Sequence, residues 1–324
     1  MQKYLRNRTT LICLLCLVFF GVGIILGRVT EKTTVIKPKV LREGGYKYIN
    51  PVLLCNTNNN QAYNEDTTLS KALIKYTEGV SENDISVYFL SLLSGKWASV
   101  NENETFSPAS MLKVPTMVET LKYAELHPEI LSKQVYYDGS FDDNKVEYFK
   151  PQKTIQSGWY YSVDNLLTSI ITYSDNNALR LLHDTIALSS FQNLYKDLKI
   201  DIPANSIDFM SAKTYSLFLR VLYNSTYLTR ESSEKALKLM TTSDFPQGLK
   251  SGVPSFIDIA NKFGERQVFT PNGTLTQREL HDCGIVYAPD NPYVLCVMTR
   301  GQNFDSLISS IKNISALVYN QVVK

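Results

Sequence analysis

The spacing of apolar residues along the 324-residue chain changes several times, and each change predicts a different element. Apolar residues three and four positions apart indicate helices, whereas short runs of β-branched and aromatic residues bounded by turn residues indicate strands. Helices are expected at 68–78, 163–172, 176–186, 191–198, 212–223, 232–240 and 304–322, with one more beginning after Phe106. Strands are expected at 84–93, 96–100, 256–263, 284–288 and 293–300.

Strands therefore lie at both ends of the chain around a helical middle. This order favours an α/β (α+β) fold in which the first strands pair with the last ones in one antiparallel sheet. Helices would flank the sheet, and an inserted all-helical lobe would leave a cleft between lobe and sheet.

Residues 1–28 are predicted to be an N-terminal membrane anchor. Lys3, Arg6 and Arg8 precede an uncharged, mostly apolar run at 11–27, and Arg28 follows it. A helix of this length just reaches across a hydrocarbon layer of roughly 30 Å. The basic flank would stay in the cytoplasm, so we expect a single-pass protein of the cell membrane with an extracytoplasmic domain.

A cleaved secretory signal is the competing interpretation of the same segment. Such a signal needs small residues before the cut, and the sequence from Gly27 to Val29 does not provide them. The uncleaved anchor is therefore favoured, while cleavage would release the domain as a secreted protein.

Residues 29–67 are predicted to be a polar linker, with a short extended piece at 48–54, and residues 68–324 the folded domain. Residues 1–67 hold nine Lys or Arg and four Asp or Glu, whereas the remaining chain holds 24 and 27. The basic excess thus belongs to anchor and linker, and a nucleic-acid partner is not expected. With 44% hydrophobic and 20% charged residues, the composition is globular and excludes a largely disordered chain.

The predicted domain contains two cysteines, Cys283 and Cys296, on either side of a turn at 289–292. They could lie nearly opposite each other on a hairpin, but we expect two small buried hydrophobic side chains rather than a disulfide. No group of residues has metal-ligand spacing, so neither a metal nor an organic cofactor is expected.

A serine nucleophile is expected to use a lysine as its base, because each of the three histidines has a structural interpretation. Ser-x-x-Lys on a helix places hydroxyl and amine on adjacent turns, and burial can leave the lysine neutral enough to accept a proton. The pattern also begins at Ser232 and Ser309, where the lysines would be solvated. Ser110 and Lys113 instead lie at a helix start, whose free backbone N–H groups can hold an oxyanion.

Two further short motifs follow. Ser-Asp-Asn at 174–176 lies between two predicted helices and also suits a helix N-cap. Lys262 lies two residues before Gly264 on a predicted strand, where glycine would let a ligand approach an ammonium group closely.

In this order, Ser-x-x-Lys, Ser-Asp-Asn and Lys-x-Gly resemble the motif set of class A β-lactamases and penicillin-binding proteins. The resemblance covers residues 68–324 and implies a β-lactamase-like sandwich. It also implies that Ser110 is the acylated nucleophile, Lys113 its proton acceptor and Ser174 the relay of a proton to the leaving nitrogen.

The resemblance implies substrate contacts as well. Asn176 would bind the substrate amide and Lys262 the substrate carboxylate. Gly264 would keep the strand open, and the backbone N–H groups of Ser110 and Glu265 would form the oxyanion hole.

The sequence departs from this family pattern at two places. Phe263 stands where the family usually has a Thr or Ser hydroxyl, so carboxylate binding should depend more on Lys262. The Glu-x-x-Leu-Asn segment with which class A enzymes activate water is missing, and the short loop at 199–210 holds only Asp201 and Asp208, which we interpret as solvated. Acylation could then remain fast while hydrolysis slows, with Lys113 serving both half-reactions.

We therefore expect a membrane-anchored extracytoplasmic serine hydrolase that forms an acyl-enzyme with β-lactams, hydrolyses it slowly and takes part in the response to these antibiotics. One alternative is a D,D-peptidase or penicillin-binding protein acting on peptidoglycan stem peptides. The other is a non-catalytic, anchored wall-binding protein.

Overall fold

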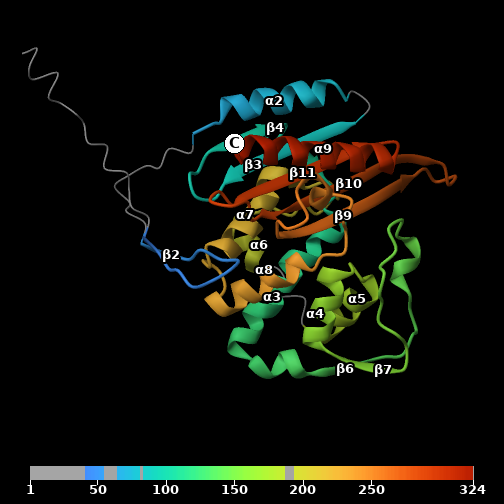
Figure 1. The fold of residues 1–324 in the computed structure, drawn as a ribbon. Coiled ribbons are helices and arrows are strands. Elements are labelled where there is room, and N and C mark those ends of the chain that lie inside the picture. Colours follow the sequence, from blue (N-terminus) through green and yellow to red (C-terminus); the bar gives the residue numbers. More distant parts are fainter. Residues whose placement is uncertain (1–40, 55–63, 81–82, 187–192, 324) are drawn as a thin grey trace, which may run out of the picture. The chain divides into compact units, whose positions relative to one another are not determined.

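The computed structural model describes residues 41–54, 64–80, 83–186 and 193–323 (Figure 1). The predicted anchor at 1–28 lies outside these residues, as does much of the predicted linker. Within the described ranges, no helix combines the length and the apolar character that a membrane crossing requires. All elements below belong to the unit formed by residues 40–324.

A five-stranded antiparallel sheet has the order β4-β3-β11-β10-β9. The first strands pair with the last as predicted, because β3 lies beside β11. Its strands are β3 Asp84–Ser91, β4 Trp97–Val100, β9 Ile259–Phe269, β10 Leu275–Val286 and β11 Tyr293–Gly301. The antiparallel sheet expected from the sequence is therefore confirmed, and β9 forms one of its edges.

Strand β10 is much longer than the predicted strand at 284–288. The part of β10 that was not predicted, residues 275–283, is largely polar. Nevertheless, its residues Glu279, His281 and Asp282 are fully buried. Their polar groups bond to Arg300, to a backbone carbonyl and to Asn261, respectively. Because these partners compensate the burial, a strand without an apolar pattern becomes part of the core.

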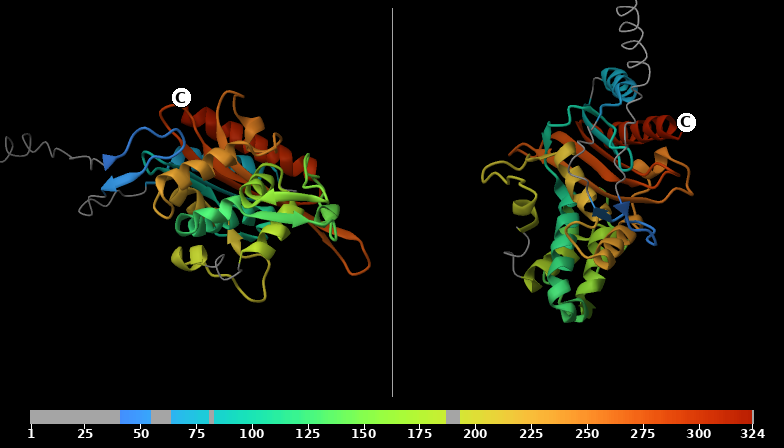
Figure 2. Two further views of the ribbon diagram at one scale, coloured as in Figure 1. Left: turned by 90° about the horizontal axis from the view of Figure 1, so that it is seen from below. Right: turned by 90° about the vertical axis from the view of Figure 1, so that its left-hand side faces the viewer.

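Helices cover both faces of the sheet, as predicted (Figures 1 and 2). The C-terminal helix α9 packs on β10 and β11 and contacts α2, while α7 packs on the opposite face against β3, β10 and β11. Beneath α7 lie α3 and α8. The bounds of these helices are α2 Thr67–Glu78, α3 Lys113–Leu126, α7 Ala212–Tyr223, α8 Arg230–Thr241 and α9 Phe304–Val322.

The inserted lobe is helical and also carries a two-stranded antiparallel pair, β6–β7, which the sequence did not predict. A second small pair, β5–β8, joins the segment before α3 to the segment before α7. The bounds are α4 Val163–Thr172, α5 Asn176–Thr185, α6 Asn193–Asp197, β5 Thr105–Phe106, β6 Gln134–Tyr137, β7 Trp159–Ser162 and β8 Met210–Ser211. Short 3₁₀ turns lie at Ala109–Leu112, Pro128–Ser132, Asp143–Val146 and Leu249–Gly252.

The expectation that Cys283 and Cys296 are two unlinked hydrophobic side chains is wrong. The two residues lie directly opposite each other in the β10–β11 ladder and form a disulfide. Both are fully buried, so the burial was correctly expected. The disulfide forms because β10 extends beyond the predicted strand and its register with β11 places the two cysteines opposite each other.

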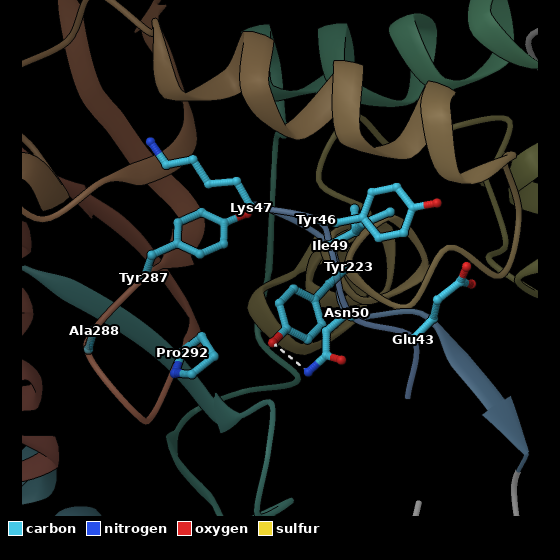
Figure 3. A pocket seen from close by; sticks show the side chains of 10 residues that line it. Glu43, Tyr46, Lys47, Ile49, Asn50, Tyr223, Tyr287, Ala288 and Pro292 are labelled. Atoms are coloured by element: carbon cyan, nitrogen blue, oxygen red, sulfur yellow. Dashed lines mark hydrogen bonds between the residues drawn. The ribbon is translucent and has the colours of Figure 1, made fainter. Parts of the chain in front are cut away.

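The segment between β1 (Leu41–Arg42) and β2 (Val52–Leu54) packs against the domain rather than extending away from it (Figure 3). The Glu234 carboxylate on α8 accepts the backbone N–H groups of Lys47, Tyr48 and Ile49. Tyr48 and Ile49 are buried. Figure 3 shows how this segment and Tyr287 line opposite sides of a pocket. Part of the predicted linker therefore contributes to the core.

We predict that Glu234→Ala releases this segment, because three charge-assisted hydrogen bonds are lost at once. The expected cost is about 2 kcal/mol of unfolding free energy, with faster hydrogen exchange at the amides of residues 47–49. Glu231→Ala, at an exposed position one turn away on the same helix, is the matched control. Equal exchange protection in the two variants would show that Glu234 does not hold the segment.

Candidate active site

The three motifs predicted to carry chemistry meet at the Lys113 amine. Its Nζ donates to Ser110 Oγ at 2.5 Å and to Asn176 Oδ1 at 2.5 Å. It also lies 3.0 Å from the carbonyl oxygen and 3.2 Å from the hydroxyl of Ser174. Ser-x-x-Lys and Ser-Asp-Asn thus form one connected polar group.

The third motif joins the same group through the Ser174 hydroxyl. Lys262 Nζ donates to Ser174 Oγ at 2.9 Å and to the Phe263 carbonyl at 2.9 Å. One hydroxyl therefore lies within hydrogen-bond distance of two lysines. This geometry offers a proton path from Lys113 towards Lys262.

The turn that carries Ser110 is fixed by local backbone geometry. The 3₁₀ turn Ala109–Leu112 precedes α3, and Ala109 has a φ of 46°. Ser174 likewise has a φ of 60°. A left-handed backbone is unfavourable for a residue with a Cβ, and such residues gather at functional sites. The unfavourable backbone at Ala109 and Ser174 is therefore part of the local geometry that places Ser110 and Ser174 beside Lys113.

Gly264 lets strand β9 pack directly on the turn of the nucleophile. A Cβ at this position would lie 2.7 Å from the Pro108 carbonyl oxygen and 3.1 Å from the Met111 backbone nitrogen. Any larger residue would push the strand away from Ser110. The requirement for glycine at 264 therefore comes from the packing of the protein itself.

Burial sets the protonation of the two lysines. Lys113 is 1% exposed and Lys262 is fully buried. Loss of hydration lowers the pKa of Lys113 to about 8, against the opposing effect of carboxylates led by Glu147. Burial, reinforced by the positive charge of Lys113, lowers the pKa of Lys262 well below its usual value. Lys113 can therefore be neutral near physiological pH and accept a proton from Ser110.

Asp175 has the expected N-cap role rather than a chemical one. Its fully buried carboxylate accepts the Asn177 backbone N–H at the start of α5. It also accepts hydrogen bonds from the Asn144 side chain and the Ile155 backbone N–H. These contacts fix the Ser-Asp-Asn turn on the segment that precedes β7.

Two carboxyl groups, those of Glu147 and Glu265, lie close enough to Lys113 to act on its charge, and the sequence pattern did not identify them as a pair. Glu147 accepts from the side-chain amide of Asn176, and Glu265 accepts the Phe149 backbone N–H at 2.6 Å. Burial raises the pKa of Glu265 to about 8, and the neighbouring Glu147 carboxyl group acts in the same direction. Glu265 was predicted for its backbone N–H alone. No periodicity or spacing joins it to Glu147, because they come from separate parts of the fold.

His281 is a structural group and not the base of a serine nucleophile. Its ring is fully buried, and its Nδ1 accepts the Thr299 backbone N–H. The Nε2 hydrogen is therefore donated to the Ser107 carbonyl, 3.0 Å away. Burial lowers the pKa of His281 to about 3, so the ring stays neutral. It ties β10 to the segment just before Ser110.

The Phe263 ring packs into the core and also contacts the polar group, because Lys262 Nζ lies over its face, 4.3 Å from the ring centroid. This ring is 5% exposed and stacks on Phe245, with centroids 4.1 Å apart. Phe149 meets it edge to face. The ring belongs to the core cluster that includes α9, and Ser174 provides the neighbouring hydroxyl for Lys262.

Asp208 is a partly exposed loop residue, as interpreted, but it is also held by ion pairs that the sequence did not predict. Its carboxylate pairs with Arg266 at 3.2 Å and with Arg300 at 3.6 Å. These bonds tie the short loop before β8 to strands β9 and β11. Asp201 is exposed, as expected. In the part of the chain that is described, no group of three His, Cys, Asp or Glu residues is arranged to hold a metal.

A family profile described as the β-lactamase enzyme family matches residues 68–322. The chain belongs to this family. It is a serine hydrolase of the β-lactamase type, as the motif set indicated, and its mixed α/β fold is the β-lactamase fold.

Solved structures show the same fold. PBP-A is 18% identical with a TM-score of 0.66, covering 79% of this chain and 96% of PBP-A. The TLA-3 extended-spectrum β-lactamase is 17% identical with a TM-score of 0.67, covering 80% and 99% of the two chains. A β-lactamase from Xanthomonas campestris is 18% identical with a TM-score of 0.65, covering 81% and 100%. A comparison with curated proteins found no match.

Covalent labelling of Ser110 by a penicillin should become faster as the pH rises through about 8. The neutral amine is the reactive form, so the rate should rise about tenfold per pH unit below this pKa and level off above it. Stopped-time labelling of the full chain between pH 6 and 9 measures this profile.

Two lysines of α3 provide the comparison for that profile. Lys113→Met should abolish labelling, while Lys122→Met, at a half-exposed position, should keep the wild-type profile. A wild-type rate that is independent of pH would contradict the proposed role of Lys113 as the base.

Proposed function

We propose that this protein is a membrane-anchored, extracytoplasmic hydrolase that forms an acyl-enzyme at Ser110 with β-lactams and hydrolyses it slowly. The observation that carries the proposal is the contact between Ser110 Oγ and the buried amine of Lys113, whose pKa is lowered to about 8. A lysine in this state can accept the hydroxyl proton as the oxygen attacks a carbonyl carbon.

Acylation proceeds in two proton transfers. Ser110 Oγ bonds to the β-lactam carbonyl carbon while its proton passes to Lys113. The tetrahedral oxyanion is held by the backbone N–H groups of Ser110 and Glu265. The carbon–nitrogen bond then breaks, and Ser174, within 3.2 Å of Lys113, relays a proton to the leaving nitrogen.

The substrate spans the cleft from Asn176 to Lys262. The Asn176 side-chain amide binds the carbonyl of the acyl amide group, and Lys262 attracts the carboxylate of the substrate. Because Phe263 offers Lys262 a buried ring face and no hydroxyl, the Ser174 hydroxyl supplies the neighbouring polar contact. We infer that the bound carboxylate favours the protonated form of Lys262, against the burial that lowers the pKa of this amine.

Slow hydrolysis follows from the missing base for water. Asp208 is engaged by Arg266 and Arg300, and Asp201 is exposed on the short loop. Lys113 is then left to serve in deacylation as well as acylation. A structural neighbour supports a long-lived adduct, because a PBP-A variant was solved as an acyl-enzyme complex with penicillin G.

A peptidase acting on peptidoglycan stem peptides is the second candidate. It uses the same nucleophile, base and relay, and the structural likeness to PBP-A favours it. An anchored wall-binding protein without activity would need neither a buried Lys113 nor its contacts with Ser110 and Ser174. The apolar run at 11–27 supports the anchor in each case.

Labelling with a fluorescent penicillin tests the acyl-enzyme. We expect a covalent adduct on the wild-type full chain and none on Ser110→Ala. Ser232→Ala is the matched control, because Ser232 begins a second Ser-x-x-Lys sequence on helix α8. The absence of an adduct on the wild type would refute the proposal.

A chromogenic cephalosporin then separates slow from efficient hydrolysis. We expect a burst of about one product per active site followed by a slow steady rate, since deacylation limits turnover. Fast, sustained turnover without a burst would contradict slow deacylation and leave the acylation chemistry intact.

A further inference from the structure

The segment between β1 and β2 forms a pocket with the domain, and none of the ten described residues that line it belongs to the candidate active site. Figure 3 shows Tyr287 on one side of this pocket, Tyr46 and Glu43 on the other, and Tyr223 with Asn50 between them. The pocket has a volume of about 260 Å³. This is smaller than the roughly 300–1,000 Å³ of pockets that enclose drug-sized ligands, so it suits one ring of a longer molecule.

Contacts within the protein hold this pocket in shape before any ligand binds. The Tyr287 hydroxyl donates to the Tyr48 carbonyl at 2.9 Å, and the Asn50 backbone N–H donates to the Tyr223 carbonyl at 2.8 Å. The rings of Tyr48 and Tyr287 also meet edge to face, with centroids 5.3 Å apart. Together with the bonds from Glu234 to the same segment, these contacts fix both walls. A ligand would therefore lose little binding free energy to ordering of the protein.

Both charged side chains that line the pocket are paired within the protein. Lys47 Nζ lies 2.7 Å from the Asp258 carboxylate, and Glu43 forms an ion pair with Arg230. A charged ligand would have to compete with these pairs, whereas a neutral ligand leaves them intact. The pocket therefore favours a neutral, polar ligand.

The other lining groups combine aromatic rings with polar edges. Tyr46, Tyr223 and Tyr287 contribute three rings, and each ring has an apolar face and a hydroxyl. Asn50 Nδ2 donates to the Tyr223 hydroxyl at 3.4 Å, which is longer than an ordinary hydrogen bond. This amide is therefore available to a better-placed acceptor. A sugar ring matches such a site, because C–H groups cover its faces and hydroxyl groups its edges.

We propose that this pocket binds one N-acetylhexosamine ring of a neutral oligosaccharide. The acetamido group of such a ring carries a carbonyl acceptor and an N–H donor, which complement the side-chain amide of Asn50. The inference goes beyond the proposed function, since it does not depend on acylation of Ser110. It also gives a role to the folded part of the predicted linker, because residues 43–50 form one wall of the site.

Calorimetric titration of the full chain with tri-N-acetylchitotriose tests the site. Cellotriose is the comparison, because it has the same linkage without acetamido groups. The detergent must have no sugar headgroup, so that it does not compete for the pocket.

Two variants change the pocket and one changes a tyrosine elsewhere. Tyr46→Ala removes one ring, and Asn50→Leu removes the side-chain amide at similar size. Tyr136→Ala is the matched control, because Tyr136 is an exposed tyrosine on β6 whose ring contacts Tyr160. Thermal unfolding of the three variants is compared with that of the wild type to show that each is folded.

We expect tri-N-acetylchitotriose to bind the wild type at least about fivefold more tightly than cellotriose. Its affinity should fall by about fivefold or more in Tyr46→Ala and in Asn50→Leu and stay unchanged in Tyr136→Ala. No binding to the wild type, equal binding of the two sugars, or unchanged affinity in either pocket variant would overturn the inference. Failure of a penicillin to label Ser110 would instead overturn the proposed function and leave the sugar site unaffected.

Discussion

Burial of the Lys113 amine is the constraint on which the active site depends. A charged lysine is costly to remove from water, so the site is stable only where neighbours accept its hydrogen bonds. Ser110, Ser174 and Asn176 provide these acceptors at distances of 2.5 to 3.2 Å. The same burial lowers the pKa of the amine to about 8 and thereby makes it a base.

Contacts from several parts of the fold hold the residues of this site in place. Gly264 allows β9 to approach the turn of Ser110, and neutral His281 ties β10 to the segment before it. Asp175 holds the Ser-Asp-Asn turn from the other side. The loop before β8 is held by Asp208 to the sheet. Nucleophile and base are therefore fixed by elements from the whole domain.

The sequence predicted most helices because their buried faces have clear apolar periodicity, and the order of the elements predicted that the first strands pair with the last ones. Three short motifs, whose order matched a known set, also singled out Ser110, Lys113, Ser174, Asn176 and Lys262, and the structure brings these residues into contact. Membership of the β-lactamase enzyme family agrees with that resemblance.

The features that the sequence did not predict depend on contacts between residues far apart in the chain, and a single sequence does not reveal such contacts. Strand β10 is polar and is buried through partners on other elements, so its length and the disulfide between Cys283 and Cys296 were missed. Asp208 was interpreted as solvated and Glu147 was not singled out, because only the fold places them beside Arg266 and Glu265. The role of a charged residue depends on neighbours that the fold brings together from distant parts of the chain. Apolar periodicity, by contrast, predicts a helix or strand from the local sequence alone.

The most direct test of this account is a nuclear magnetic resonance titration of the lysine side chains in the unmodified protein. The Lys113 signal is assigned as the one missing from Lys113→Met. The account predicts that this amine titrates near 8, far from exposed lysines at about 10.4. A Lys113 signal that titrates with the exposed lysines would contradict it, because the amine would then be charged whenever Ser110 must lose its proton.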